Sequence, residues 1–179
     1  IDELLPEGWP PQPLWIVAVR TNDGKRIVFG RDDVRGTPGQ ASQASSAIPG
    51  IYAPTPIGDR EYIDGAVHSS TNADLVATLG FDLVIISSVK TATPEARSWT
   101  SDAERAWFSN KLESEVAEIR SRGTAVMVIE PAEPELTELS RTDDTLRRRA
   151  CQAGRAATER VLAGRDGDGI RAILGAVTN

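Results

Sequence analysis

Short apolar runs separated by turn residues recur along the first third of the chain and predict strands joined by tight turns. The continuous apolar run at residues 14–19 is typical of a strand that is covered on both faces. Asn-Asp-Gly at 22–24 is a turn signal and residues 25–29 return as a second strand, so the two strands are expected to form a hairpin or meander. Small residues at 40–47 predict a short helix, which Pro49 ends.

The rest of the chain alternates helical and strand patterns. A helix is predicted at 72–79, with Gly80 as its C-terminal cap. The β-branched run at 83–89 comes directly after it and predicts a buried strand, and this order is typical of a βαβ-like unit with a parallel sheet. The remaining predicted elements are an amphipathic helix at 101–122, a covered strand at 124–129, a charged helix at 142–162 and a short helix at 170–177.

The N-terminal stretch differs in character from the rest of the chain. Residues 1–13 are rich in proline and read as a connector, and the sequence starts at Ile1 rather than Met, so we expect further polypeptide ahead of it. After residue 14 the sequence shows neither an internal repeat nor a domain boundary.

Composition narrows the classes of partner. Twenty basic against twenty-six acidic residues give a net charge of -6, which opposes nonspecific binding to nucleic acid and broad attraction to anionic lipid. A local lipid-binding patch remains open. Cys151 is the only cysteine, so a reducing compartment is the simpler inference. With no signal-peptide pattern and no apolar run of about 20 residues, the sequence predicts a cytoplasmic protein, peripheral to a membrane at most.

The strand Tyr62-Ile63-Asp64 ends in a carboxylate on an Asp-Gly turn, which is the strongest candidate for chemistry. Such a turn places Asp64 at a strand tip, among loops rather than core. A carboxylate there can act as a general base. The plain alternative is that the Asp-Gly pair is only a turn.

Other candidates have weaker support. His68 lies four residues past Asp64 and suggests a triad, although a surface histidine is the simpler interpretation. Ser45 and Ser46 are interpreted as residues of a helix start that cap backbone donors or pack closely against the sheet, rather than as nucleophiles. Trp99, Trp107 and Phe108 could form a membrane-touching edge or a lid, but core packing is favoured.

No metal or cofactor is indicated. One histidine and one cysteine cannot build a common zinc site. Residues 166–169 (Asp-Gly-Asp-Gly) lack the further oxygen ligands and the closing glutamate of a calcium loop, so a turn is expected.

Two sequence blocks carry a family resemblance. These are Ala-Ser-Ser-Ala-Ile-Pro-Gly at 44–50 and Tyr-Ile-Asp-Gly-Ala-Val at 62–67, followed by the strand at 81–87. In this order they resemble the C-terminal half of the patatin-like phospholipases, which are serine acyl hydrolases. The resemblance is good over residues 14–89 and looser beyond them.

The resemblance implies a fold and a mechanism. The fold would be the C-terminal part of a three-layer α/β/α sandwich around a mixed, mainly parallel sheet, with 14–179 as the C-terminal portion of the domain. A serine on a Gly-x-Ser-x-Gly turn would attack the ester, and Asp64 would activate that serine directly, without histidine. Gly65 would let the backbone turn sharply, and Ala66 replaces the commoner second glycine.

The chain departs from the family in one important way. It contains no Gly-x-Ser-x-Gly and no Gly-Gly-Gly oxyanion loop, both of which lie ahead of the hairpin in the family. The expected partners are therefore an N-terminal part that supplies the serine and a lipid or other acyl-ester substrate, with transient contact to a membrane surface as a further option. Alone, the chain is expected to hydrolyse nothing at a useful rate.

Two other functions stay open. One is a non-catalytic α/β interaction module that retains the scaffold. The other is an unrelated nucleotide-binding α/β protein, against which the lack of a glycine-rich phosphate loop counts.

Overall fold

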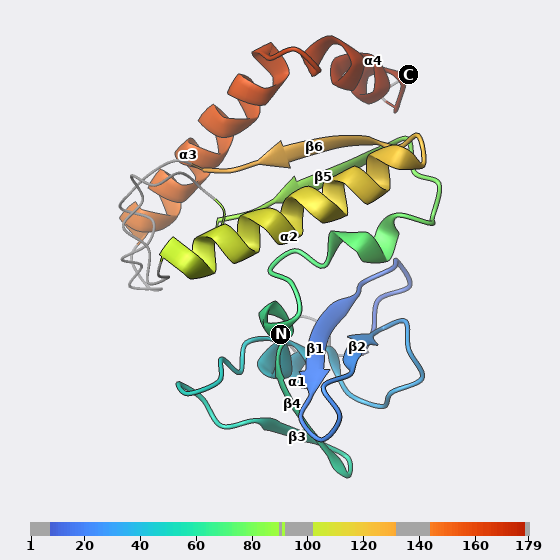
Figure 1. Cartoon of the computed structure of the whole chain (residues 1–179), viewed down its shortest axis with the longest axis vertical. Coiled ribbons are helices and arrows are strands. Elements are labelled where there is room, and N and C mark those ends of the chain that lie inside the picture. Colours follow the sequence, from blue (N-terminus) through green and yellow to red (C-terminus); the bar gives the residue numbers. More distant parts are fainter. Residues whose placement is uncertain (1–7, 90, 92–101, 132–143, 178–179) are drawn as a thin grey trace. The chain divides into compact units, whose positions relative to one another are not determined.

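The computed structural model describes residues 8–89, 91, 102–131 and 144–177 (Figure 1). The chain forms two compact units, Ile1–Asn72 and Ala73–Asn179. The described residues contain helices and two sheets, one of them parallel. The mixed α/β class predicted from the sequence is therefore confirmed.

The first unit is built on a four-stranded sheet in the order β2-β1-β4-β3. Its strands are β1 (Ile16–Arg20), β2 (Arg26–Phe29), β3 (Thr55–Ile57) and β4 (Arg60–Asp64). The predicted hairpin at 14–29 is present as β1 and β2, and the strand before Asp64 is present as β4. The sequence pattern does not reveal β3, a three-residue edge strand whose central residue is Pro56.

All pairings in this sheet are antiparallel. The expectation of a mainly parallel sheet is wrong here, because short turns connect β1 to β2 and β3 to β4, and a short turn can only join antiparallel neighbours. Parallel pairing occurs in the second unit instead.

Helix α1 (Pro38–Ser45) packs on this sheet, close to the predicted 40–47. A capping box starts it: the Gln40 backbone N–H donates to Thr37 Oγ1 (3.1 Å), and the Thr37 N–H donates to Gln40 Oε1 (2.9 Å). Ala41 and Ala44 are fully buried in one core with Ala18 of β1. Because all three side chains are single methyl groups, the helix can approach the sheet closely. The other buried members of this core are Ile27, Phe29, Ile57 and Tyr62.

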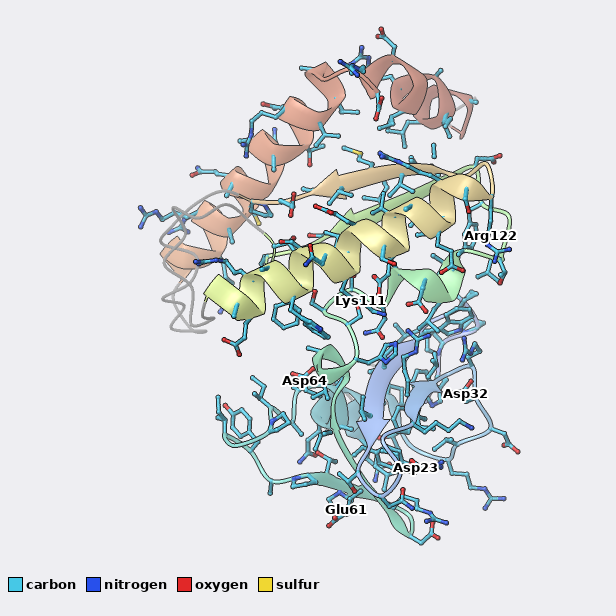
Figure 2. All side chains as sticks on the ribbon, in the orientation of Figure 1. Asp23, Asp32, Glu61, Asp64, Lys111 and Arg122 are labelled. Carbon is cyan, nitrogen blue, oxygen red and sulfur yellow. The ribbon has the colours of Figure 1, made fainter. Side chains whose placement is uncertain are left out.

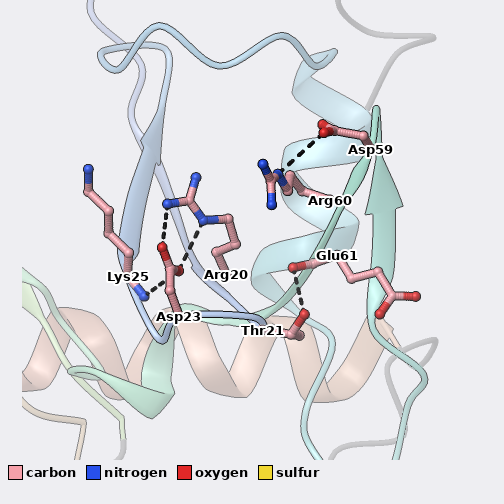
Figure 3. A network of polar contacts seen from close by, with 7 residues as sticks. All are labelled: Arg20, Thr21, Asp23, Lys25, Asp59, Arg60 and Glu61. Atoms are coloured by element: carbon pink, nitrogen blue, oxygen red, sulfur yellow. Dashed lines mark hydrogen bonds and ion pairs between the residues drawn. The ribbon is translucent and has the colours of Figure 1, made fainter.

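An exposed polar network holds the turn between β1 and β2 (Figure 3). The Arg20 guanidinium donates to both carboxylate oxygens of Asp23 (3.0 and 2.6 Å), and the Lys25 backbone N–H donates to Asp23 Oδ1 (3.1 Å). The hydrogen bond from Arg20 is the main reason why the pKa of Asp23 is lowered to about 2. Thr21 Oγ1 then links the turn to β4 by donating to the Glu61 carbonyl (3.2 Å).

The second unit contains a parallel pair, β5 (Leu83–Ser87) and β6 (Ala125–Ile129), joined through α2 (Asp102–Ser121). Both strands and the helix lie close to their predicted positions. Helix α2 lies along one face of the pair (Figure 1), and Ile86, Val126, Leu112 and Ile119 form the core between them. The unit ends with α3 (Asp144–Ala163), which contacts β6, and α4 (Gly167–Val177), which contacts α3.

The helix predicted at 72–79 is shorter than expected. It is a single 3-10 turn, η2 (Ala73–Val76), and later N–H groups also bond three residues back, from Ala77 to Asp74 and from Leu79 to Val76. The buried Glu115 of α2 accepts a hydrogen bond from the Ala73 N–H through Oε2 (3.0 Å) and so fixes the start of the turn. Gly80 has a φ of 70°, the left-handed conformation predicted for it.

One prediction about β5 is wrong. The apolar run 83–89 predicts a buried strand, yet Ile85 is 53% exposed. Only the side of β5 that bears Val84 and Ile86 packs in the core with α2. A strand with one bare face therefore shows the same apolar sequence as a fully covered one.

The turn network leads to a pH prediction. Replacing Arg20 with methionine should raise the pKa of Asp23 from about 2 toward its ordinary 3.8, as measured by NMR titration of the Asp23 carboxyl. Because folding lowers this pKa, the carboxylate contributes stability above the unfolded-state pKa, and the contribution is lost as the pH falls from about 4 to 2.

As a control, Arg60→Met should leave the Asp23 pKa unchanged, since Arg60 pairs with Asp59. An Asp23 that titrates at 3.8 in the unaltered chain would contradict the account.

Candidate active site

Asp64 is the last residue of β4 and lies opposite Ala18 of β1 (Figure 2). Its backbone N–H donates to the Ala47 carbonyl (3.0 Å). Its carboxylate Oδ1 accepts from the Ala66 N–H (2.8 Å) and so caps the 3-10 turn η1 (Gly65–Val67). The structure therefore places Asp64 at a strand tip, as predicted, and holds both its backbone and its side chain.

The bond between Ala47 and Asp64 joins the two sequence blocks that carry the family resemblance. The first block ends α1 and continues through the turn after it, while the second ends β4. Ala44 and Ala47 are buried, so the end of the helix can lie against the strand. The two blocks are thus parts of one local structure.

Position 65 has no room for a side chain, so it requires glycine. It is buried, and a Cβ built on it would lie 2.4 Å from the carbonyl oxygen of Val17 and 2.9 Å from the carbonyl carbon. Its φ is not in the left-handed range, so the sharp turn expected from the sequence is not what demands glycine. Glycine is required because β1 passes directly beside the residue that follows the aspartate.

The Asp64 carboxylate is half-buried. Within the described ranges of the chain, the Ala66 N–H is its only hydrogen-bond partner. One oxygen is therefore oriented by a backbone amide, while Oδ2 can accept a proton from an incoming hydroxyl group. That arrangement suits a general base whose position is set by its neighbours.

The other sequence candidates near Asp64 lie at the ends of helical elements. His68 follows η1, where its backbone N–H donates to the Gly65 carbonyl (3.0 Å). Ser45 and Ser46 do not lie at a helix start as expected, since Ser45 is the last residue of α1 and Ser46 is its C-cap. The position is reversed because α1 begins at Pro38, where the Thr37 capping box starts it.

The aromatic pair on α2 is split between core and surface. Trp107 and Phe108 pack edge to face with ring centres 5.0 Å apart, and Phe108 is buried whereas Trp107 is exposed. The core packing expected from the sequence is therefore confirmed for Phe108 but not for Trp107. Trp99 lies outside the described residues.

The described residues contain no group of three or more His, Cys, Asp or Glu side chains that could hold a metal ion. In the Asp-Gly-Asp-Gly segment, Asp166 pairs with Arg120 (3.6 Å) and Asp168 pairs with Arg171. None of the helices in the described ranges has both the length and the apolar character needed to span a membrane.

A hollow of about 550 Å³ lies in the second unit, beside α2 and β6. Apolar Leu112, Val116 and Val128 share its lining with charged Glu113 and Arg120. Asp64 does not line it, so this hollow belongs to a different part of the fold.

Residues 16–77 match the family model of the patatin-like phospholipases. This part of the chain is therefore similar to the patatin-like phospholipases. The match runs from the start of β1 past Asp64 and into the segment after η2, and it includes both sequence blocks. Residues 78–179 lie outside it.

Two exposed residues of this patatin-like region were not among the sequence candidates. Ile51 and Tyr52 follow the first block and are 60% and 54% exposed. A signal is nevertheless present in the sequence. No charged residue occurs between Arg35 and Asp59, although 26% of the chain is charged.

The close approach at Gly65 predicts a stability effect. Gly65→Ala should lower the free energy of unfolding by about 2 kcal/mol, because the new methyl group collides with the Val17 carbonyl. Urea unfolding monitored by circular dichroism measures this. Gly154→Ala is the matched control. Gly154 lies in α3 with nothing within 4 Å of its added Cβ, so alanine should stabilise the helix by about 0.5–1 kcal/mol. Equal midpoints for Gly65→Ala and the unaltered chain would refute the steric argument.

Proposed function

We propose that this protein is a lipid acyl hydrolase that cleaves carboxylic esters with a Ser-Asp dyad, in which Asp64 is the base. The match of residues 16–77 to the patatin-like family model supports the general class, since that family consists of lipid acyl hydrolases. The observation that carries the proposal is the Asp64 carboxylate itself. Its Oδ1 is held by the Ala66 N–H, and its Oδ2 can accept a proton.

The proposed reaction has two halves. In the first, Asp64 takes the proton of a serine hydroxyl as the serine oxygen attacks the ester carbonyl, and it then gives that proton to the departing alcohol. The product is an acyl-serine. In the second half, Asp64 takes a proton from water as the water oxygen attacks the acyl-serine, and it returns that proton to the serine oxygen as the carboxylic acid is released. A single carboxylate serves both halves, without histidine.

The nucleophile is proposed to come from polypeptide ahead of Ile1, because residues 1–179 contain no Gly-x-Ser-x-Gly sequence. In this proposal, residues 14–179 are the C-terminal portion of the domain, and the added part completes a three-layer α/β/α sandwich around a mixed sheet. The substrate is a lipid or similar acyl ester. The single cysteine supports a reducing, cytoplasmic setting.

A non-catalytic interaction module is the second candidate. Such a module would retain the patatin-like scaffold without its nucleophile. Activity measurements on a form that includes the serine-bearing part separate the two candidates.

The decisive substitution is Asp64→Asn in that serine-bearing form, assayed with p-nitrophenyl esters. An asparagine Oδ1 can still accept from the Ala66 N–H, so the fold should persist, but the amide cannot take up the serine proton. We expect kcat/KM to fall by about 10²- to 10⁴-fold. Asp59→Asn is the matched control, because Asp59 is a strongly exposed carboxylate in the same unit and should leave the rate unchanged.

Two outcomes would overturn the proposal. If Asp64→Asn keeps the full rate, the dyad assignment is wrong. If a folded, serine-bearing form hydrolyses no ester, the protein is better described as an interaction module.

A further inference from the structure

The segment that follows Asp64 is attached to the sheet of the first unit at both of its ends. It leaves β4 at Asp64, and at Gly65 it passes directly beside the carbonyl of Val17 on β1. It ends at Asn72, whose Oδ1 accepts a hydrogen bond from Nη1 of Arg26 on β2 (3.2 Å). Since β1 lies between β4 and β2 in the sheet, the segment is fastened to the strands on both sides of β1.

Asn72 combines an unusual backbone conformation with a buried side chain. Its φ is 49°, and in the described parts of the chain no other residue except glycine has a positive φ. Asparagine tolerates this conformation better than most residues, but the surrounding structure must hold it there. Besides the bond from Arg26, the Asn72 N–H donates to Ser69 Oγ (3.0 Å) and its Nδ2 donates to the Ser69 carbonyl (2.6 Å).

Ser69 connects Asn72 to the turn that Asp64 caps. Ser69 is buried, and its N–H donates to the carbonyl of Gly65, the first residue of η1 (3.2 Å). In the same turn the Ala66 N–H donates to Asp64 Oδ1. Hydrogen bonds therefore lead from Asn72 through Ser69 to the turn whose amide orients the Asp64 carboxylate.

The turn η1 depends on these outside bonds because it is only three residues long. A single 3-10 turn has poor hydrogen-bond geometry of its own, so its place is set by what holds its two ends. Asp64 caps the first end, and Ser69, which Asn72 binds, holds the second. If the second end moved, the Ala66 N–H would move with it, and the Asp64 carboxylate would lose its fixed direction.

We propose that Asn72 is a positioning residue for Asp64. By binding Ser69 and Arg26 it fixes the far end of η1 and so keeps the Ala66 N–H directed at the carboxylate. The catalytic consequence, a slower chemical step when this bond is loosened, rests on the proposed function. The effect on the Ala66 N–H itself does not.

The positional effect is tested with Asn72→Gly in the full chain, by amide hydrogen exchange measured with NMR. Glycine adopts a positive φ without strain, so the fold should persist while the side-chain bonds are lost. Exchange of the Ala66 N–H should become about tenfold faster or more, because two hydrogen bonds that hold the turn are gone. The N–H groups of β1 and β2 should exchange as before. Asn22→Gly is the matched control, since Asn22 lies in the exposed turn between β1 and β2 and should not affect Ala66.

The catalytic consequence is tested in the serine-bearing form with p-nitrophenyl esters. Asn72→Gly should lower kcat by about tenfold or more and leave KM within about twofold, because the direction of the base changes while ester binding does not. A residue that only stabilised the fold would not separate kcat from KM in this way. Asn22→Gly should change neither quantity.

Three results would contradict the positioning role: unchanged Ala66 exchange in Asn72→Gly, exchange that rises equally at Ala66 and throughout β1 and β2, or a raised KM with an unchanged kcat. The second result would mean that Asn72 only stabilises the unit as a whole. The proposed function fails separately, if Asp64→Asn keeps the full rate. Because amide exchange is measured without catalysis, it still decides in that case whether Asn72 holds the turn.

Discussion

The hydrogen bond from the Asp64 N–H to the Ala47 carbonyl organises the first unit around its candidate site. It requires the end of α1 to lie close to β4, which the buried methyl side chains of that helix permit. It also requires β1 to pass beside the residue after the aspartate, which only glycine at position 65 allows without a collision. The small residues of both sequence blocks are thus explained by one packing constraint.

Within that constraint the aspartate is fixed but keeps one oxygen available. Its backbone belongs to the sheet and one carboxylate oxygen belongs to η1, so the side chain has little freedom to turn away. The second oxygen is left for chemistry. In the proposed dyad, a carboxylate oriented in this way would need no histidine to position it. The same backbone connection places the exposed turn at Ile51 and Tyr52 close in sequence to the residue that holds the base.

Most of the elements are predictable from the sequence because their signals are local: the Asn-Asp-Gly turn, the small-residue helix and the apolar strands all lie near their expected positions. The strand tip at Asp64 is predictable for the same reason. Strand β3 is not, since Pro56 in a three-residue edge strand gives no alternating pattern. The bare face at Ile85 and the steric need for Gly65 depend on what lies opposite them in space, which a single sequence does not reveal. The four-stranded antiparallel sheet contradicts the mainly parallel sheet that the resemblance implies, whereas the parallel pairing expected from the helix–strand order is present in the second unit.

The most direct test of the central claim asks which group activates the serine. The rate at which a fluorophosphonate modifies the nucleophilic serine can be measured against pH in the serine-bearing form and in its His68→Gln variant. The account predicts the same acid limb in both, because a carboxylate and not an imidazole accepts the proton. If the acid limb shifts or disappears when His68 is replaced, direct activation by Asp64 is contradicted.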